Sequence, residues 1–462
     1  MSWWKDRSLL LALLSGLLLR TVPMAVWARL WPCVRDECTY FKLAYRMVEG
    51  EGMTSSSGWL WAPGYPTLMA LHQLVFGHAT AIRGTQVFIA LVATVLLYRL
   101  AGGLAARFTT DPAVVLRASR LAAWLYALSL PQAFFAMGAW SEVVYTGVLL
   151  AALTAVLAAR RAQGGRALAL AALTGACVGA CVLFRGVATY MLPIFLVALL
   201  WGRLRRPSSW AQALAALLAA VLSVAPYSLY ATRTFQTPVI SDRTMGQMMW
   251  LGNNDFAPIT FDYGNGPLSG RAFDRVTAQG RPFCAPRKDT MRRDACEVEA
   301  GIEWIRAHPK PFLIRVPIRA AQLLNPHSLL TRHLRWGYWP GLPLWVDELI
   351  IATGAFSALL ILWLGPIGLL ARTRSAFALL SGGILLYHLA AISLLAGLTR
   401  YRIPLEPFLM IGTALLLADP RGAWAALRAS PPRLAACALV LAVMVPLTLW
   451  YLPAGWPGWR RW

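Results

Sequence analysis

Apolar runs about as long as a bilayer is thick recur along the whole chain, and they constrain its fold more than any other feature. A helix that crosses the hydrocarbon core of a membrane needs about 20 mostly apolar residues. About eleven candidate spans of this kind lie near residues 8–29, 82–104, 118–138, 142–159, 166–184, 187–202, 209–231, 343–370, 376–397, 403–418 and 434–452. Only 14% of the residues are charged, whereas soluble domains carry about 25%. The sequence therefore predicts an all-α polytopic membrane protein with about 11 transmembrane helices.

The basic residues are unevenly distributed between the two ends of these spans. The chain has 43 Lys and Arg against 20 Asp and Glu, a net charge of +23 at pH 7. If the spans alternate in direction, the short basic loops all fall on one side, which the positive-inside rule identifies as cytoplasmic. These loops carry Arg107, Arg117 and Arg120; Arg160, Arg161 and Arg166; Arg203, Arg205 and Arg206; Arg372 and Arg374; and Arg421, Arg428 and Arg433. Because the arginines punctuate apolar runs, we expect no nucleic-acid partner.

Two long connections fall on the opposite, outer side, at roughly residues 30–81 and 232–342. We predict one transmembrane domain over residues 1–452 that includes these outer loops, followed by a short aromatic and basic tail at 453–462. The first span lacks an A-x-A cleavage site, so we expect it to be retained. Long connections are uncommon in compact proteins unless they have a function. We therefore expect the active site on the outer face.

The seven cysteines favour packing and disulfides over a metal site, because no metal-like C-x-x-C pair occurs. Cys33 with Cys38, or Cys284 with Cys296, could be oxidised in an outer compartment, but sequence alone does not give the connectivity. Two further cysteines lie in the run LTGACVGACVL, whose small residues predict a close helix contact.

Adjacent acids, Asp36 and Glu37, stand at the predicted membrane boundary just after the first span. Acidic residues are costly at that depth unless they are paired or functional. From Thr39 to Val48 the apolar residues recur at helical spacing, which predicts an amphipathic helix lying on the membrane surface, and a second such helix begins after Pro66. Asp36 could cap the first of these helices or take part in catalysis, and its position fits both interpretations.

Four segments together resemble the GT-C class of integral-membrane glycosyltransferases, in particular the protein O-mannosyltransferases and the lipid A aminoarabinose transferase. The first is the loop itself: an apolar span, the acidic pair, an amphipathic helix ending in EGEG, and then APGYP. The others are APYSLYATRTFQ at the end of the seventh span, MMWLGNND at Met248–Asp255, and RYRIPLEPFLMIG at Arg400–Gly412. They occur in the family's order and spacing over most of the chain. The resemblance also suggests a bacterial inner (plasma) membrane, with the active site facing the periplasm or exterior.

The resemblance implies transfer of a sugar from a polyprenyl-phosphate-linked donor to a hydroxyl or amine acceptor on a glycan, a lipid or a protein. It implies that Asp36 is the general base, a role that suits a carboxylate within reach of an attacking hydroxyl. Glu37 is then expected to hydrogen-bond or position rather than act as a second base. No cofactor is required, although Asp36, Glu37 and Glu142 could hold a divalent cation. The aminoarabinose transferases have an Arg soon after the acidic pair, where this sequence has Thr39, with Lys42 three residues on.

Two candidates lie at the outer ends of the third, fourth and fifth spans. Glu142, in AMGAWSEVVY, occupies a turn where the family also has an acid facing the cavity. It could instead be a first-turn acid behind a capping Ser141, stabilised by the helix dipole. Arg185, in VLFRGVATY, could pair with a carboxylate or the lipid phosphate, or extend to the interface.

The leaving group of such a donor is a phosphate, so the site needs cations that neutralise it. Arg400 and Arg402 flank Tyr401 on the outer side, where the positive-inside rule disfavours them. We predict that they bind the phosphate, with interfacial anchoring as the alternative. Lys42 and Arg46 are secondary candidates.

The second outer loop contributes Asn253 and Asn254 as candidate recognition residues by analogy with the family. A Gly-Asn-Asn-Asp sequence also makes an ordinary turn. The later stretch IEWIRAHPKPFLIRVPIRAAQLLNP predicts a structural helix broken by prolines.

Two other functions remain open at this stage. A glycan ligase or oligosaccharyl transferase using a lipid pyrophosphate would share outer-face arginines, but the metal-dependent transferases have a D-x-D motif that this first loop lacks. A secondary transporter should show repeat symmetry and acids near the middle of the membrane, and neither is evident in the sequence.

Overall fold

The computed structural model describes residues 3–27, 33–34, 36–53, 60–255, 284, 290–335, 342–372, 376–395 and 397–455. Within these ranges the regular secondary structure is helical, and extended pairing is limited to one isolated bridge between Leu60 and Arg243. The prediction of an all-α chain is therefore confirmed.

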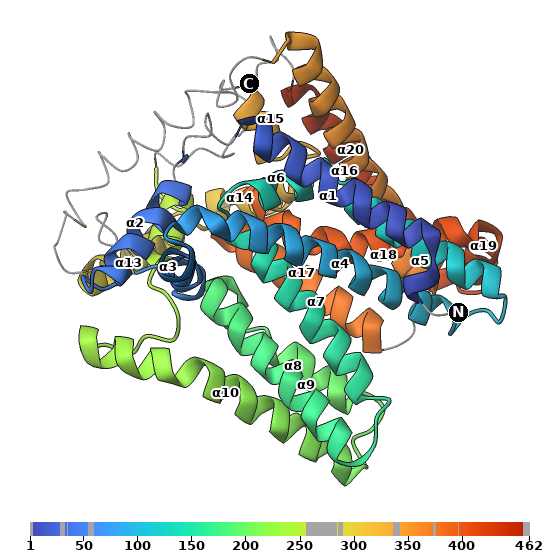
Figure 1. Cartoon of the computed structure of the whole chain (residues 1–462), viewed down its shortest axis with the longest axis horizontal. Helices are drawn as coiled ribbons and strands as arrows, with labels where there is room; N and C mark the ends of the chain where they lie inside the picture. Colours follow the sequence, from blue (N-terminus) through green and yellow to red (C-terminus); the bar gives the residue numbers. More distant parts are fainter. Residues whose placement is uncertain are drawn as a thin grey trace.

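Across the described ranges, nine helical segments are long and apolar enough to cross a membrane. They are α1 (Arg7–Trp27), α4 (Ile82–Ala105), α7 (Ser141–Ala159), α8 (Gly164–Phe184), α10 (Pro207–Phe235), α16 (Leu344–Arg372), α17 (Ala376–Leu394), η4 (Thr399–Leu405) with α18 (Glu406–Ala418), and α20 (Pro431–Tyr451). Figure 1 shows α4, α17 and α18 crossing the middle of the view, with α8 and α10 below them. The prediction of a polytopic membrane fold is confirmed.

The other two predicted spans are helical but interrupted or short. The span predicted at 118–138 consists of α5 (Pro112–Ala127) and α6 (Leu130–Met137), which meet at an angle of 51°. Ser129 caps α6 by accepting from the Gln132 N–H, and Pro131 stands in the first turn, where its missing N–H prevents one continuous helix. The span predicted at 187–202 is η3 (Gly186–Ala188) followed by α9 (Leu192–Leu200). Counting the bent pair as one span gives ten crossings in the described part of the chain.

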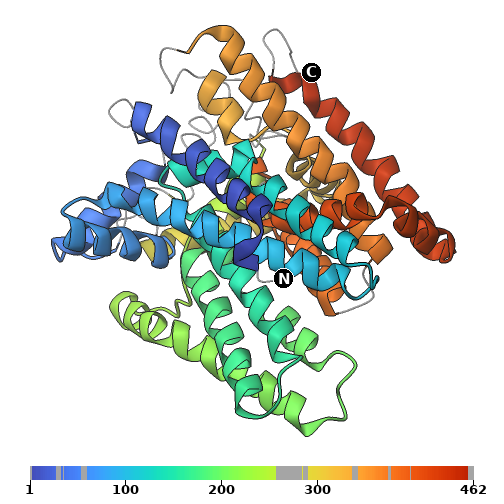
Figure 2. The same ribbon diagram turned by 45° about the vertical axis from the view of Figure 1, so that its right-hand side comes forward.

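Helices α7 to α10 form a group that projects from the rest of the bundle, as Figures 1 and 2 both show. Within this group α8 packs directly on α10 through small residues. A Cβ on Gly175 would lie 1.8 Å from the Ala216 carbonyl oxygen, and one on Gly179 would lie 2.8 Å from that of Ala220. The neighbouring Cys181 is buried. The helix contact predicted from the small-residue run is therefore confirmed.

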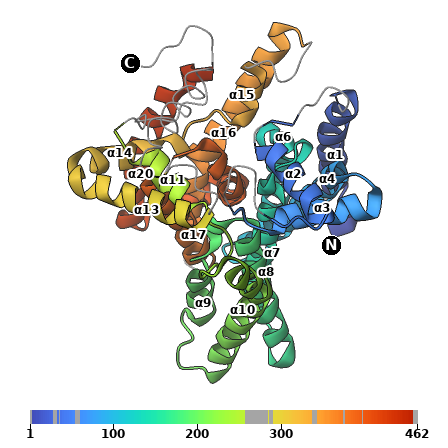
Figure 3. The same ribbon diagram turned by 90° about the vertical axis from the view of Figure 1, so that its left-hand side faces the viewer.

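One end of the bundle carries the short helices of the two outer loops, and we call it the loop end. It bears α2 (Asp36–Val48), α3 (Gly64–Phe76), α11 (Met245–Gly252) and α13 (Thr290–Ala307), all of which face the viewer in Figure 3. Helix α2 is amphipathic as predicted and buries Tyr40, Leu43 and Ala44. Tyr40 packs edge-on against Tyr65 of α3, with the ring centroids 4.8 Å apart. Together α2 and α3 form a small platform beside the spans.

The second loop returns to the bundle through α13, α14 (Pro309–Leu323) and α15 (Leu329–Arg335), with the predicted proline break between α13 and α14 at His308. The remaining elements are η1 (Trp3–Lys5), η2 (Ala79–Ala81), α19 (Pro420–Arg428) and η5 (Leu452–Gly455).

Several arginines of the predicted cytoplasmic side hold helix ends together. Arg120 of α5 pairs with Asp6, whose carboxylate also accepts from the Ser8 N–H at the start of α1. Arg160 donates to the Leu199 and Trp201 carbonyls at the end of α9. The direction in which the chain crosses the membrane stays a prediction.

Candidate active site

Four charged side chains from four separate elements meet at the loop end, and we call them the Asp36 cluster: Asp36, Glu142, Arg185 and Arg400. Asp36 opens α2, Glu142 lies in the first turn of α7, Arg185 follows α8 directly, and Arg400 lies in η4. Arg400 bonds to Asp36 from 364 residues further along the chain. The predicted candidates from the first loop and from the RYRIPLEPFLMIG segment are therefore brought together.

Glu142 is the centre of this cluster. Its side chain is fully buried, and one oxygen, Oε1, lies 2.7 Å from Arg185 Nη1 and 2.9 Å from Arg400 Nε. Removing a carboxylate from water is costly unless it is paired, and here two guanidinium groups offset its charge. Ser141 is the first residue of the same helix, which follows Trp140 without a side-chain cap, and its hydroxyl accepts from Arg185 at 3.2 Å. The predicted alternative is therefore wrong in making Ser141 the cap, although Glu142 does lie in the first turn of α7.

Asp36 is the more accessible of the two acids, with 28% of its side chain exposed, and its carboxylate faces Arg400. One turn later on α2, the Tyr40 hydroxyl lies 3.3 Å from the Ser141 hydroxyl. The polar contacts thus run from Asp36 through the cluster and return to α2 at Tyr40. This closed ring fixes the orientation of α2 relative to α7.

Aromatic rings cover the two arginines. The Arg400 guanidinium lies 5.3 Å from the centroid of Trp140, and that of Arg185 lies 5.1 Å from the centroid of Tyr401. These distances are typical of cation–π contacts, which strengthen when the cation is shielded from water. Tyr401, a predicted substrate-binding residue, therefore contacts the cluster through its ring.

Besides Glu142 Oε1 and Arg400 Nε, which form an ion pair with each other, two buried polar atoms of the site have no hydrogen-bond partner among the described residues: Glu142 Oε2 and Trp140 Nε1. Buried polar groups in native proteins are nearly always satisfied, so such exceptions point to a ligand or a water molecule. The cluster can thus still accept a hydrogen bond at Glu142 and donate one from Trp140.

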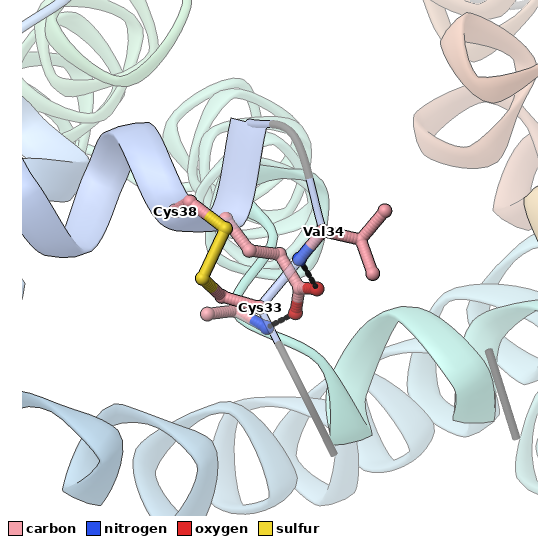
Figure 4. Close-up of a disulfide and its surroundings, with 5 residues drawn as sticks. Cys33, Val34 and Cys38 are labelled. Atoms are coloured by element: carbon pink, nitrogen blue, oxygen red, sulfur yellow. Dashed lines mark hydrogen bonds between the residues drawn. A yellow bond between two sulfur atoms is a disulfide. The ribbon is translucent and has the colours of Figure 1, made fainter.

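Glu37 belongs to a different network from Asp36. Its carboxylate accepts the backbone N–H of Val34 at 3.1 Å and that of Ala139 at 2.6 Å, and its side chain is fully buried. Figure 4 shows the neighbouring disulfide between Cys33 and Cys38, which brackets the acidic pair. Glu37 and this disulfide thus hold the start of α2.

The second candidate pair is also bonded: Cys284 is joined to Cys296 of α13. Both disulfides considered from the sequence are therefore present in the structure.

Lys42 and Arg46 lie outside the cluster. Lys42 is exposed on α2, and Arg46 contacts Glu51 at 3.2 Å. The structure does not bring either residue to Asp36.

Arg402 also lies outside the cluster, although it is only two residues from Arg400. Its side chain is 2% exposed, and its Nε lies 3.1 Å from Oε1 of Glu406, while Nη1 donates to the carbonyls of Leu323 and Asn325. These contacts join η4 to the end of α14. Arg402 is thus placed to brace the bundle, and the structure does not support the phosphate-binding role predicted for it.

Asn253 and Asn254 are buried where the MMWLGNND segment meets α14. The Asn253 side-chain oxygen accepts from Arg319 at 3.2 Å, and the Asn254 carbonyl accepts from Arg315 at 3.0 Å. Arg319 also donates to the carbonyls of Ser393 and Leu394 at the end of α17. The two asparagines therefore anchor the second loop in this structure, rather than facing Asp36.

Sequence reasoning missed three neighbours of the cluster as site residues: Tyr40, Trp140 and Asp242. Tyr40 could have been found from its spacing, because it lies four residues after Asp36 and so on the same helix face. Nothing in the local sequence of Asp242 indicates that it lies beside Gly186, 56 positions earlier in the chain.

A metal site needs several ligating side chains close together. Among the residues that the structure describes, no three His, Cys, Asp or Glu side chains are grouped so that they could hold a metal ion. Asp36 and Glu142 face arginines, and Glu37 faces backbone N–H groups.

The fold and the Asp36 cluster define a polytopic helical membrane protein with a largely buried ionic site at its loop end. No protein-family model matches the chain, and no curated protein matches it. The archaeal oligosaccharyltransferase AglB from Archaeoglobus fulgidus, in complex with an inhibitory peptide and a dolichol-phosphate, is similar at 15% identity and a TM-score of 0.44, over 100% of this chain and 57% of that chain. ArnT from Cupriavidus metallidurans, bound to undecaprenyl phosphate, is similar at 16% identity and a TM-score of 0.38, over 89% of this chain and 77% of that chain.

This chain thus spans a little over half the length of the archaeal enzyme, 57% in one structure and 56% in another. Both neighbours are GT-C glycosyltransferases, the class that the first-loop motifs resemble.

Proposed function

We propose that this protein is a membrane glycosyltransferase that moves a sugar from a polyprenyl-phosphate-linked donor to a hydroxyl or amine acceptor on the extracytoplasmic side of the membrane. One observation carries the proposal: a partly exposed carboxylate, Asp36, meets the buried Arg400, which shares Glu142 with Arg185, at the end of the bundle that bears the amphipathic helices. Base, phosphate-binding cations and interfacial position are the three things that this transfer needs.

The charges of the cluster balance in the absence of a substrate, since two carboxylates face two guanidinium groups. A donor phosphate entering the site competes with Asp36 for Arg400, whose planar fork suits phosphate oxygens. Arg400 can turn toward the phosphate while its Nε stays against Glu142. Donor binding then releases Asp36 from its ion pair.

The released carboxylate is the general base. An acceptor hydroxyl or amine attacks the anomeric carbon, the bond from that carbon to the phosphate oxygen breaks, and the acceptor proton passes to Asp36. The leaving lipid phosphate gains negative charge, which Arg400 and Arg185 stabilise. Glu142 keeps both guanidinium groups in place through the reaction.

The test is sugar transfer in membranes supplied with labelled polyprenyl-phosphate sugars. Asp36→Asn keeps the shape of the side chain but removes the base, so transfer should fall by about 10²–10⁴-fold while donor binding persists. Glu299→Gln, which neutralises an exposed acid of α13, is the matched control and should transfer at the wild-type rate.

Three further arms separate the alternatives. Transfer from lipid-pyrophosphate donors alone would indicate a ligase or oligosaccharyl transferase, and donor movement across the membrane without transfer would indicate a transporter. A chelator should leave the rate unchanged, because the proposed chemistry uses arginines to neutralise the phosphate. An Asp36→Asn variant with full activity would refute the base assignment.

A further inference from the structure

The segment from Ser241 to Thr244 joins the second outer loop to both the first loop and the site. The Ser241 hydroxyl donates to the Val182 carbonyl at 2.6 Å, near the end of α8. The Arg243 N–H donates to the Leu60 carbonyl at 2.7 Å, and its guanidinium lies 3.5 Å from Asp294 of α13. Asp242 is held between these contacts.

The Asp242 carboxylate rests directly on the backbone of Gly186, the residue after Arg185. A Cβ at Gly186 would lie 2.2 Å from Asp242 Oδ1 and 2.4 Å from Oδ2, so only glycine leaves room for this approach. The Thr244 hydroxyl donates to Oδ2 at 3.1 Å, and the Gly186 backbone N–H favours the charged form of the carboxylate. The acid thus holds the corner at which α8 ends and Arg185 turns toward Glu142.

The charged and titratable groups near Asp242 belong to several neighbouring elements. Arg185 attracts it, Asp294 repels it while itself facing Arg243, and the Tyr227 phenol of α10 lies within its field. Burial raises the pKa of Asp242 to about 6, with Asp294 adding to the rise, while Thr244, Arg185 and the Gly186 N–H oppose it. The carboxylate therefore changes charge within the pH range of an ordinary assay.

We propose that Asp242 is a positioning residue, which holds the Arg185–Gly186 corner so that Arg185 stays against Glu142 and can bind the donor phosphate. This role rests on the proposed function, because it concerns the phosphate site of that reaction. Asp242 acts through Arg185 and does not touch the reacting atoms.

Two variants disturb the same contact from opposite sides. Asp242→Asn keeps the shape and removes the charge, whereas Gly186→Ala keeps the charge and pushes the carboxylate away. At pH 8 both should raise the donor KM about tenfold, as expected for a lost hydrogen bond to a charged group, with a much smaller effect on kcat. Glu299→Gln should leave KM unchanged. At pH 5 the wild type should approach Asp242→Asn, because its own Asp242 is then protonated.

For the wild type and the same three variants, we would also measure the binding of undecaprenyl phosphate alone to the purified protein in detergent between pH 5 and 8. The lipid monophosphate itself takes up a proton near pH 6, which weakens its binding to every variant. The proposal is supported if wild-type binding weakens more steeply than Asp242→Asn binding as the pH falls through about 6, so that the two curves converge. Binding curves that stay parallel at a constant offset would show a purely structural role and overturn it, as would unchanged binding in both variants or no binding by the wild type. A pH step in binding without any sugar transfer would uphold the inference and defeat the proposed function.

Discussion

Arg400 and Arg402 lie two residues apart in η4 and are both buried, yet their surroundings differ in kind. Arg400 faces the carboxylates of Asp36 and Glu142 and the rings of Trp140 and Tyr401. Arg402 faces Glu406 of the following helix and two backbone carbonyls at the end of α14. A side-chain partner such as Asp36 can be displaced by a ligand, whereas carbonyls at a helix end cannot move without moving the helix. We therefore propose binding for Arg400 and bracing of the bundle for Arg402.

Removing the bracing contacts of Arg402 should have the largest effect, a loss of folding stability. Arg402→Gln leaves the buried carboxylate of Glu406 with Gln132, which donates to it at 3.0 Å, but without its cation. Removing one partner of a buried ion pair costs about 3–5 kcal/mol. We expect a lower unfolding temperature in detergent and a lower folded yield, whereas the molecules that do fold should retain transfer activity.

The paired variant Arg402→Gln with Glu406→Gln checks the cause. It removes both charges, so part of the lost stability should return. If Arg402→Gln melts like the wild type but fails to bind the donor, Arg402 belongs to the phosphate site after all.

Removing the guanidinium group of Arg400 should lower the rate of sugar transfer instead. Arg400→Gln removes the donor that faces Asp36 and the phosphate, and loss of such a group costs about 10²–10³-fold in kcat. Stability should change less than in Arg402→Gln, because Glu142 keeps Arg185 as a partner at 2.7 Å. The measurement is transfer kinetics alongside thermal unfolding of the same preparations.

Arg400→Lys sharpens this result. It keeps the charge but loses the planar fork, so we expect partial activity with a raised donor KM. Wild-type kinetics in Arg400→Gln would contradict the proposed phosphate role.

The fold of this chain could be predicted from its sequence because the length of an apolar run is a local property. Each predicted span corresponds to a helix, and the two irregular ones have local causes, such as Pro131 at the start of α6. The amphipathic helix α2 was predicted from its spacing in the same way. Hydropathy alone did not predict the bend of 51° between α5 and α6 or the short helix in the segment Gly186–Leu200.

The sequence predicted which residues lie near the site only where the direction of their side chains was not needed for the prediction. Asp36, Glu142, Arg185 and Arg400 all lie at the ends of predicted spans on one face, so alternation of the spans was enough to group them. Arg402 points away from the cluster that contains Arg400, because a 3₁₀ segment turns by a third of a circle per residue and so places residues two apart on different sides. The partners of Asn253 and Asp242 come from contacts distant in the chain, which no local pattern reports.

We expect the smallest effect at Lys42, which belongs neither to the Asp36 cluster around Arg400 nor to the bracing contacts of Arg402. It is exposed on α2, whereas the cluster faces the interior from the same helix. Surface substitutions away from special features change free energies by about 0.5 kcal/mol or less, so Lys42→Ala should keep donor KM and kcat within about twofold of the wild type. A donor KM raised tenfold or more would mean that the phosphate reaches past Asp36 toward the exposed face of α2. In that case Arg185 and Arg400 would be only part of the phosphate site, and Lys42 would bind the phosphate together with Arg400.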